Sequence, residues 1–252
     1  PGHPEYGVTP GVEMTTGPLG QGVAHAVGMA LAEEVLAEKF NQPDHKLIDH
    51  YTYIVAGDGD LMEGVSYEAA SLAGSLELDK LIVVYDHNQV SIDGPTDITF
   101  IDDIEKRFDS ANWQVISSVD GSSFSDLETA FKKAKKDQSR PTIIIADTTI
   151  AKGIATKEGD SSAHASPLGK EEILEMKKKA GLPPEDFAVP AEVDDYFKQH
   201  LLELKNDFYE WQELKNNYQA KFEKEFKELK SGIELNADID FDDLEFQEEA
   251  GK

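Results

Sequence analysis

The chain of 252 residues is 39% hydrophobic and carries 24 basic and 50 acidic residues, which gives a formal net charge of −26. This charge argues against nucleic acid and anionic membranes as partners, and the absence of cysteine excludes disulfides and thiolate metal sites. No apolar run approaches the roughly 18 residues of a membrane span and no signal peptide is visible, so we expect a cytoplasmic protein. The length and the hydrophobic content are enough for one large core.

Residues 1–22, PGHPEYGVTPGVEMTTGPLGQG, hold four prolines and six glycines, which predicts a loop rather than a regular element. The GPLGQG segment has the wrong spacing for the dinucleotide pattern GxGxxG. The loop suits either a surface linker or the wall of a site, because such residues fix the backbone in unusual conformations. Since the chain does not begin with methionine, we expect a fragment or processed piece.

Residues 21–40 are predicted to form a helix. Its first half, GVAHAVGMALA, is apolar on most faces, which indicates burial, and its second half is amphipathic. We interpret His25 in the first half as a packed histidine rather than a catalytic one. If a covering segment is missing, this helix is also where we expect exposed apolar surface.

The central stretch, residues 51–93, is predicted to form a strand at 51–56, a Gly-Asp-Gly turn, a helix at about 64–76 and a strand at 81–86. Asp58 and Asn88 therefore follow two successive strands. In open α/β sheets, ligands bind at this carboxyl edge.

The residue types at this edge indicate a particular chemistry. The carboxylate of Asp58 and the amide oxygen of Asn88 are hard donors that suit magnesium or calcium. We expect a helix to begin directly after Gly59 and to offer backbone N–H groups to a phosphate. The pattern thus predicts a site for a metal diphosphate, although a Gly-Asp-Gly turn with a solvated Asp is the alternative for this segment alone.

The next part of the chain continues the alternation of strands and helices. Strands are predicted at 113–119 and 142–149, and Ser125 with Glu128 predicts a capping box that opens a helix to about Lys136. This order favours an α/β fold with a doubly wound, mostly parallel sheet and helices on both faces.

Residues 151–170, AKGIATKEGDSSAHASPLGK, are predicted to form a polar loop that follows a strand. Its single histidine, His164, is either a solvated loop residue or part of a site, since side chains in such loops often serve function.

From residue 171 the sequence predicts charged helices at 171–180, 191–204 and 206–230, a helical C-terminal extension. The last carries an apolar stripe that favours packing over cofactor binding. The stripe consists of Phe208, Trp211, Leu214, Tyr218, Phe222, Phe226 and Leu229.

Residues 231–252 are strongly acidic and are interpreted as a linker. Asp238, Asp240, Asp242 and Glu249 have the spacing of a calcium loop, but the chain has Asp at the position where that loop needs glycine. We therefore favour the linker over a calcium site.

Several motifs together resemble one enzyme family. The segments GDGDLMEGVSYEAASLAG and YDHNQVSIDG resemble the thiamine-diphosphate signature and, more closely, the transketolase motif GDGxxMEGxxxEAxSLAG…YDxN…ISIDG. GHPE, TTGPLGQG and HASPLG resemble three further transketolase motifs, so the resemblance spans nearly the whole chain. It implies a thiamine-diphosphate-binding fold, with 1–230 as a diphosphate-binding domain that lacks its N-terminal part and 231–252 as a linker toward a pyrimidine-binding domain.

The resemblance also implies roles for residues around the Gly-Asp-Gly turn. Asp58, the Asn88 side chain and the Val90 carbonyl would bind the divalent ion, Mg²⁺ or Ca²⁺, and Asn88 would also contact the cofactor. Gly59 would contact the diphosphate. Asp60 occupies a position that is often Cys in the family and is not diagnostic.

Further roles are implied for the two outer loops. Gly17, Pro18 and Leu19 would line the cofactor, and His3 would face the reacting carbons of the sugar. His164 would bind a diphosphate oxygen and stabilise charge on the substrate, with Ala165 in place of the usual Gly.

The implied reaction is transfer of a two-carbon ketol unit between sugar phosphates with thiamine diphosphate, as in the pentose phosphate pathway. The resemblance implies a homodimer in which the cofactor lies between this domain and the partner's pyrimidine-binding domain, which supplies an activating glutamate. The resemblance further implies that about a hundred family residues, among them two histidines, precede the segment that corresponds to residue 1. Two alternatives remain: another thiamine-dependent enzyme, against which GHPE, TTGPLGQG and HASPLG argue, and a stand-alone or split-subunit cofactor-binding module that is inactive without a partner chain.

Overall fold

The structure is a computed structural model that describes residues 5–164 and 167–233. His3, Ala165 and the acidic segment 234–252 lie outside the described residues, so the roles predicted for them stay predictions.

The chain divides into two compact units, which are described separately. The first comprises residues 1–35 and 49–198, and the second comprises residues 36–48 and 199–252. The predicted boundary at residue 230 remains untested. Within the described part of the chain, no helix has the length and apolar character needed to cross a membrane.

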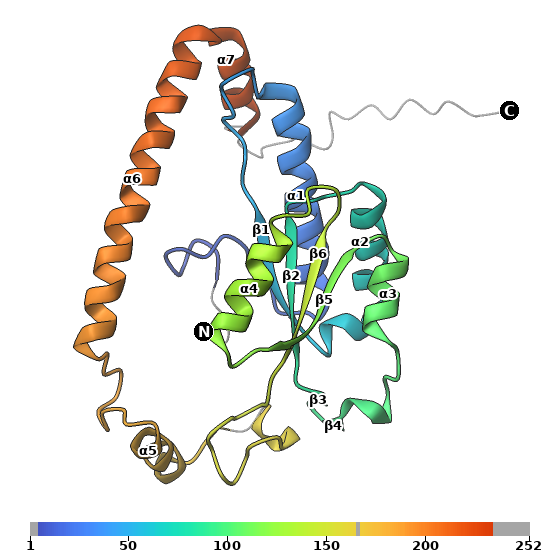
Figure 1. The fold of residues 1–252 in the computed structure, drawn as a ribbon, viewed down its shortest axis with the longest axis vertical. Helices are drawn as coiled ribbons and strands as arrows, with labels where there is room; N and C mark the ends of the chain where they lie inside the picture. The colour runs from blue at the N-terminus through green and yellow to red at the C-terminus, as the bar shows by residue number, and fades with distance from the viewer. Residues whose placement is uncertain (1–4, 165–166, 234–252) are drawn as a thin grey trace, which may run out of the picture. The chain divides into compact units, whose positions relative to one another are not determined.

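A four-stranded parallel sheet forms the centre of the first unit (Figure 1). Its strands lie in the order β1 (Thr52–Gly57), β2 (Leu81–His87), β6 (Thr142–Asp147) and β5 (Gln114–Asp120). Runs such as LIVVY in β2 and TIIIA in β6 suit strands that are covered on both faces. Because all four strands are parallel, their carboxyl ends meet at one edge of the sheet.

Helices cover both faces of this sheet, as the sequence predicted. Buried residues of α1 (Gln21–Phe40), α2 (Gly64–Ser75) and α3 (Ile104–Ser110) form one hydrophobic cluster with the sheet. Those of α4 (Phe124–Ala134) form a second cluster with β2, β5 and β6. The chain passes from β2 to β5 and then returns to β6, and right-handed crossovers place the helices of the two directions on opposite faces.

The α3 helix was not predicted, because its sequence is short and mostly polar. Asp103 caps its N-terminus by accepting a hydrogen bond from the Lys106 amide. Beyond its C-terminus, the fully buried Trp113 donates its indole N–H to the Ala70 carbonyl at 2.8 Å and packs edge-on against Phe108. These contacts attach α3 to α2 and to the sheet.

One local prediction, for the N-terminus of α4, was wrong. Ser123, rather than Ser125, caps α4 by accepting from the Asp126 amide, and the predicted capping box with Glu128 does not form. The helix predicted at about 64–76 is α2, and the turn directly after Gly59 is a 3₁₀ turn (Asp60–Met62) rather than the first turn of that helix.

The apolar first half of α1, where exposed apolar surface was predicted, packs on the sheet, whereas Val35 in its second half is 54% exposed. In α1 the residues Val23, Ala26 and Val27 are buried against the sheet. On the edge strand β1, by contrast, Tyr53 and Val55 are 49% and 72% exposed.

The C-terminal helices differ from the prediction. Helix α5 (Lys170–Lys179) agrees closely, but α6 runs from Ala191 to Lys221 without the predicted break near Lys205, because no proline or glycine interrupts it. Helix α7 covers Glu223–Ile233. The apolar stripe is buried only in its C-terminal half: Tyr218 and Leu229 form a cluster with Phe40 and Leu47, while Phe208 is 54% exposed.

Candidate functional site

Asp58 lies at the carboxyl edge of the sheet, directly after β1. It is buried, and its Oδ1 accepts a hydrogen bond from the Tyr85 hydroxyl at 2.6 Å. Its Oδ2 accepts from the backbone amides of Asn88 at 3.2 Å and Gln89 at 3.0 Å. The structure therefore brings together Asp58 and Asn88, two predicted site residues that are thirty positions apart.

Tyr85 is the buried partner of this carboxylate. Burial, reinforced by the hydrogen bond to Asp58 and the Asp58 charge, raises the pKa of the Tyr85 hydroxyl far above its usual value. The hydroxyl consequently remains protonated and donates to Asp58. Tyr85 was not predicted as a site residue; the only signal in the sequence was its place in β2, two residues before the polar loop.

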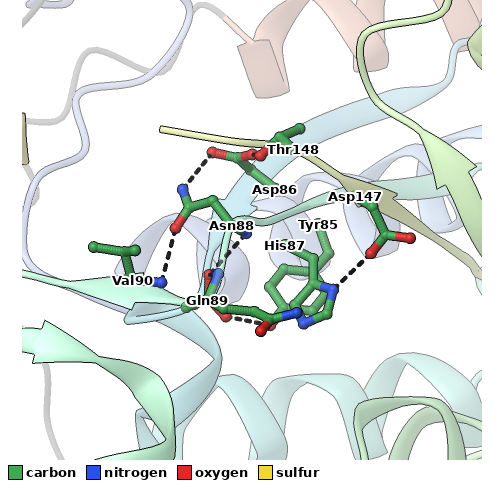
Figure 2. A network of polar contacts seen from close by, with 9 residues as sticks. Tyr85, Asp86, His87, Asn88, Gln89, Val90, Asp147 and Thr148 are labelled. Atoms are coloured by element: carbon green, nitrogen blue, oxygen red, sulfur yellow. Dashed lines mark hydrogen bonds and ion pairs between the residues drawn. The ribbon is translucent and has the colours of Figure 1, made fainter. Parts of the chain in front are cut away.

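The side chain of Asn88 is held at both ends (Figure 2). Its Nδ2 donates to Asp86 Oδ2 at 3.1 Å, and its Oδ1 accepts from the Val90 amide at 3.0 Å. Val90 begins the short β3–β4 hairpin (Val90–Ser91 and Gly94–Pro95), where it pairs with Pro95. Because Pro95 has no N–H group, it cannot donate to the Val90 carbonyl.

The donor atoms of this cluster suit a hard cation. Asp58 Oδ1 keeps a second lone pair beside the Tyr85 hydroxyl, and Asn88 Oδ1 keeps one beside the Val90 amide. These oxygens, and the Val90 carbonyl, are donors of the hard type that magnesium and calcium prefer. Among the described residues, no three His, Cys, Asp or Glu side chains form a metal-binding group.

The loop predicted to line the cofactor packs against the Gly-Asp-Gly turn. A Cβ added to Gly59 would lie 3.4 Å from Leu19 Cδ1, so the Leu19 side chain lies beside Gly59. Gly20 has a φ of +77°, and a Cβ there would come within 2.8 Å of Glu63 and Val65, which only glycine permits. The loop therefore approaches the start of α2 closely.

Asp60 connects the two segments and was missed as a site residue. Its Oδ1 accepts from the Gly20 amide at 3.1 Å and its Oδ2 from the Gly57 amide at 2.9 Å. The bond to Gly57 is a local turn contact, but the bond to Gly20 spans forty residues and has no signal in the sequence.

We expect Asp60→Ala to loosen the loop at Gly20. Hydrogen bonds to charged groups contribute about 1.5–3 kcal/mol each when buried. For these half-buried bonds we expect a loss of about 2 kcal/mol, and a melting temperature lower by about 4–8 °C. Differential scanning fluorimetry measures this, with the exposed Asp97→Ala as control. A melting temperature equal to that of the control would contradict the bridging role.

Two cavities are lined by residues of these segments. One of about 720 Å³ is lined by Gly17, Pro18 and Leu19, together with parts of α1 and β1. The other, of about 300 Å³, is lined by Asp58, Tyr85, His87 and further residues at the carboxyl edge.

His25 and His164 lie in different surroundings. His25 is partly buried and lines the larger cavity, and its Nδ1 has no hydrogen-bond partner among the described residues. His164 is exposed, after a 3₁₀ turn (Ser161–Ala163) that lies next to β4. In the described part of the chain, His164 does not belong to the hydrogen-bonded cluster around Asp58, so its role stays a prediction.

Comparison with known proteins gives one consistent family. Residues 1–237 match the family described as "Transketolase, thiamine diphosphate binding domain". The chain is 46% identical to transketolase of Bacillus subtilis over 237 residues, which cover 93% of this chain and 35% of that protein. It is 51% identical to transketolase 2 of Escherichia coli over 193 residues, which cover 77% and 29%.

Solved structures agree with this similarity. Transketolase from Leishmania mexicana superposes with a TM-score of 0.89 at 43% identity, covering 92% of this chain and 35% of that one. A transketolase from Pichia stipitis in complex with sedoheptulose 7-phosphate gives a TM-score of 0.88 at 42% identity, with coverages of 92% and 34%. The chain thus spans about a third of the length of these relatives.

Proposed function

The chain belongs to the transketolase family, and from that premise we propose that it forms the diphosphate-binding part of a ketol-transferring enzyme. The reaction would be the transfer of a two-carbon ketol unit from a ketose phosphate to an aldose phosphate. The observation that carries this proposal is the meeting of Asp58 with Asn88 and its loop at the carboxyl edge of the sheet.

Asp58, the Asn88 side chain and the Val90 carbonyl would hold Mg²⁺ or Ca²⁺. One carboxylate, one amide oxygen and one carbonyl are too few ligands for either ion, so diphosphate oxygens and water would supply the others. Tyr85 and the amides of Asn88 and Gln89 fix the Asp58 carboxylate, which lowers the cost of ordering it when the ion binds.

Gly59 and Leu19 would contact the cofactor, with Gly17 and Pro18 along the same wall. Bound thiamine diphosphate supplies the carbanion chemistry of the reaction. Asp60 would keep this wall in place by binding the Gly20 amide. The part of the relatives' length that lies outside the match would be a complementary polypeptide that covers the other side of the cofactor, in a homodimer.

The proposal is tested with the 252-residue chain combined with that complementary polypeptide, here called the assembled enzyme. Ketol transfer from xylulose 5-phosphate to ribose 5-phosphate should depend on thiamine diphosphate and on a divalent ion. Transfer that persists after both are removed would contradict the proposal.

His3 and His164 are proposed to act on the substrate rather than on the fold. Replacing either by Ala in the assembled enzyme should lower kcat by roughly 10²- to 10⁴-fold if it takes part in acid–base catalysis. The melting temperature should change little, because His164 is exposed. Steady-state kinetics and scanning fluorimetry measure both quantities, with His200→Ala on α6 as control. A large loss of stability with normal kcat would show a structural role instead.

A further inference from the structure

The alternation of side chains at the end of β2 and at Asn88, which directly follows it, separates the polar residues there into two groups. Tyr85 and His87 point to one side of the sheet, where their rings lie 5.2 Å apart. Asp86 and Asn88 lie on the other side and bind each other. Figure 2 shows the His87 contact and the Asp86 contact as separate parts of the network.

Asp86 and the Val90 amide both select which way the Asn88 amide faces. An ionised carboxylate can only accept hydrogen bonds, so Asp86 can pair with the Asn88 NH₂ group but not with its oxygen. The amide oxygen is therefore turned toward the Val90 amide. Without Asp86, only the Val90 amide would select this orientation of the Asn88 amide, and an NH₂ group cannot serve as a metal ligand.

Thr148 in turn holds Asp86. It follows the last residue of β6, which pairs with β2 in parallel. Its hydroxyl donates to Asp86 Oδ1, and its backbone amide donates to the His87 carbonyl at 3.2 Å. Both oxygens of Asp86 are thus assigned, one to Thr148 and the other to Asn88.

We propose that Asp86, held by Thr148, is a positioning residue that fixes the Asn88 amide with its oxygen toward the metal. This inference rests on the proposed function. It adds two hydrogen bonds, from Thr148 to Asp86 and from Asn88 to Asp86, which connect the end of β6 through β2 to the proposed metal ligand. Outer groups that orient a metal ligand typically affect metal affinity by 10- to 100-fold. Neither Asp86 nor Thr148 touches the cofactor in this account.

Removing the Asp86 carboxylate also removes a negative charge, and this alone could weaken metal binding. A control variant must therefore lose a charge without losing a contact to Asn88. Asp147 provides the matched control, because it is a carboxylate at the end of the neighbouring strand β6. It binds His87 Nδ1 at 2.8 Å, on the side away from Asn88. Asp147→Asn therefore removes one negative charge from the same edge of the sheet without affecting the Asn88 amide.

The test is Mn²⁺ binding to the assembled enzyme with saturating thiamine diphosphate, measured by electron paramagnetic resonance of free Mn²⁺. We expect Asp86→Ala to raise the Mn²⁺ dissociation constant by about 10- to 100-fold and Thr148→Val, which keeps the shape, by about 10-fold. Thr148→Ser, which restores the hydroxyl, and Asp147→Asn should both stay within about threefold of wild type. Melting temperatures of all variants show whether each is folded, and Thr148→Val decides the result if Asp86→Ala does not fold.

Each other outcome contradicts a defined part of the account. Wild-type Mn²⁺ affinity in Thr148→Val would overturn the positioning role. A loss of Mn²⁺ affinity in Asp147→Asn equal to that in Asp86→Ala would also overturn it, because it would indicate an effect of charge alone. If the wild type itself binds no Mn²⁺ with thiamine diphosphate, the proposed function fails, and the positioning inference fails with it.

Discussion

Asp58→Asn is expected to weaken the Mg²⁺-dependent binding of thiamine diphosphate by about 100-fold or more. Asp58 is the one carboxylate among the proposed metal ligands, and losing its charge removes the main electrostatic attraction for the ion. A hundredfold change corresponds to about 2.7 kcal/mol. Titration calorimetry of the assembled enzyme at fixed Mg²⁺ concentration measures it.

The choice of Asn rather than Ala follows from the contacts of Asp58. Asp58→Ala should weaken cofactor binding as strongly, but it would also leave the Tyr85 hydroxyl and the amides of Asn88 and Gln89 without their acceptor. A buried donor without a partner costs about 1–3 kcal/mol, so this variant also loses stability. Asn keeps one acceptor oxygen, and Asp147→Asn is again the charge control. Cofactor affinity equal to wild type in Asp58→Asn at matched Mg²⁺ would refute the metal assignment.

The second large effect concerns the 252-residue chain by itself, which we expect to show no ketol transfer and weak or no binding of thiamine diphosphate. The chain covers about a third of its relatives, and the resemblance assigns the glutamate that activates the cofactor to a pyrimidine-binding domain. Residues 1–237 match the thiamine diphosphate binding domain of the family. The exposed Tyr53 and Val55 on edge strand β1 should also favour self-association.

The measurement compares ketol transfer by the purified chain with that of the assembled enzyme, and size-exclusion chromatography of the chain reports self-association. Turnover at similar rates in both samples would show that the complementary polypeptide is not needed. That result would contradict our account of how the site is completed.

Much of the fold could be predicted because local signals agreed with it. The apolar runs of β1, β2 and β6 and the intervening helical segment predicted parallel strands whose loops meet at one edge, and this placed Asp58 near Asn88. The short polar helix α3 and the continuous α6 were not predicted, because tertiary packing of Phe108 and Trp113 fixes the first and the absence of any helix breaker extends the second.

The contacts around the site were less predictable. Asp60 reaches Gly20 across forty residues and Thr148 reaches Asp86 across sixty-two, and neither spacing follows a local periodicity. Such pairs depend on which loops the sheet brings together. The sequence could identify the metal-ligand candidates by residue type, but it could not identify the side chains that orient them.

The central claim, that this chain provides a metal–diphosphate site, is tested most directly by calorimetry of thiamine diphosphate binding to the assembled enzyme, with Mg²⁺ and with the metal chelated. The account predicts clear binding with Mg²⁺, at least about 100-fold weaker binding without it, and a similar loss in Asp58→Asn with Mg²⁺ present. Equal affinity with and without the metal, or no binding under either condition, would contradict it.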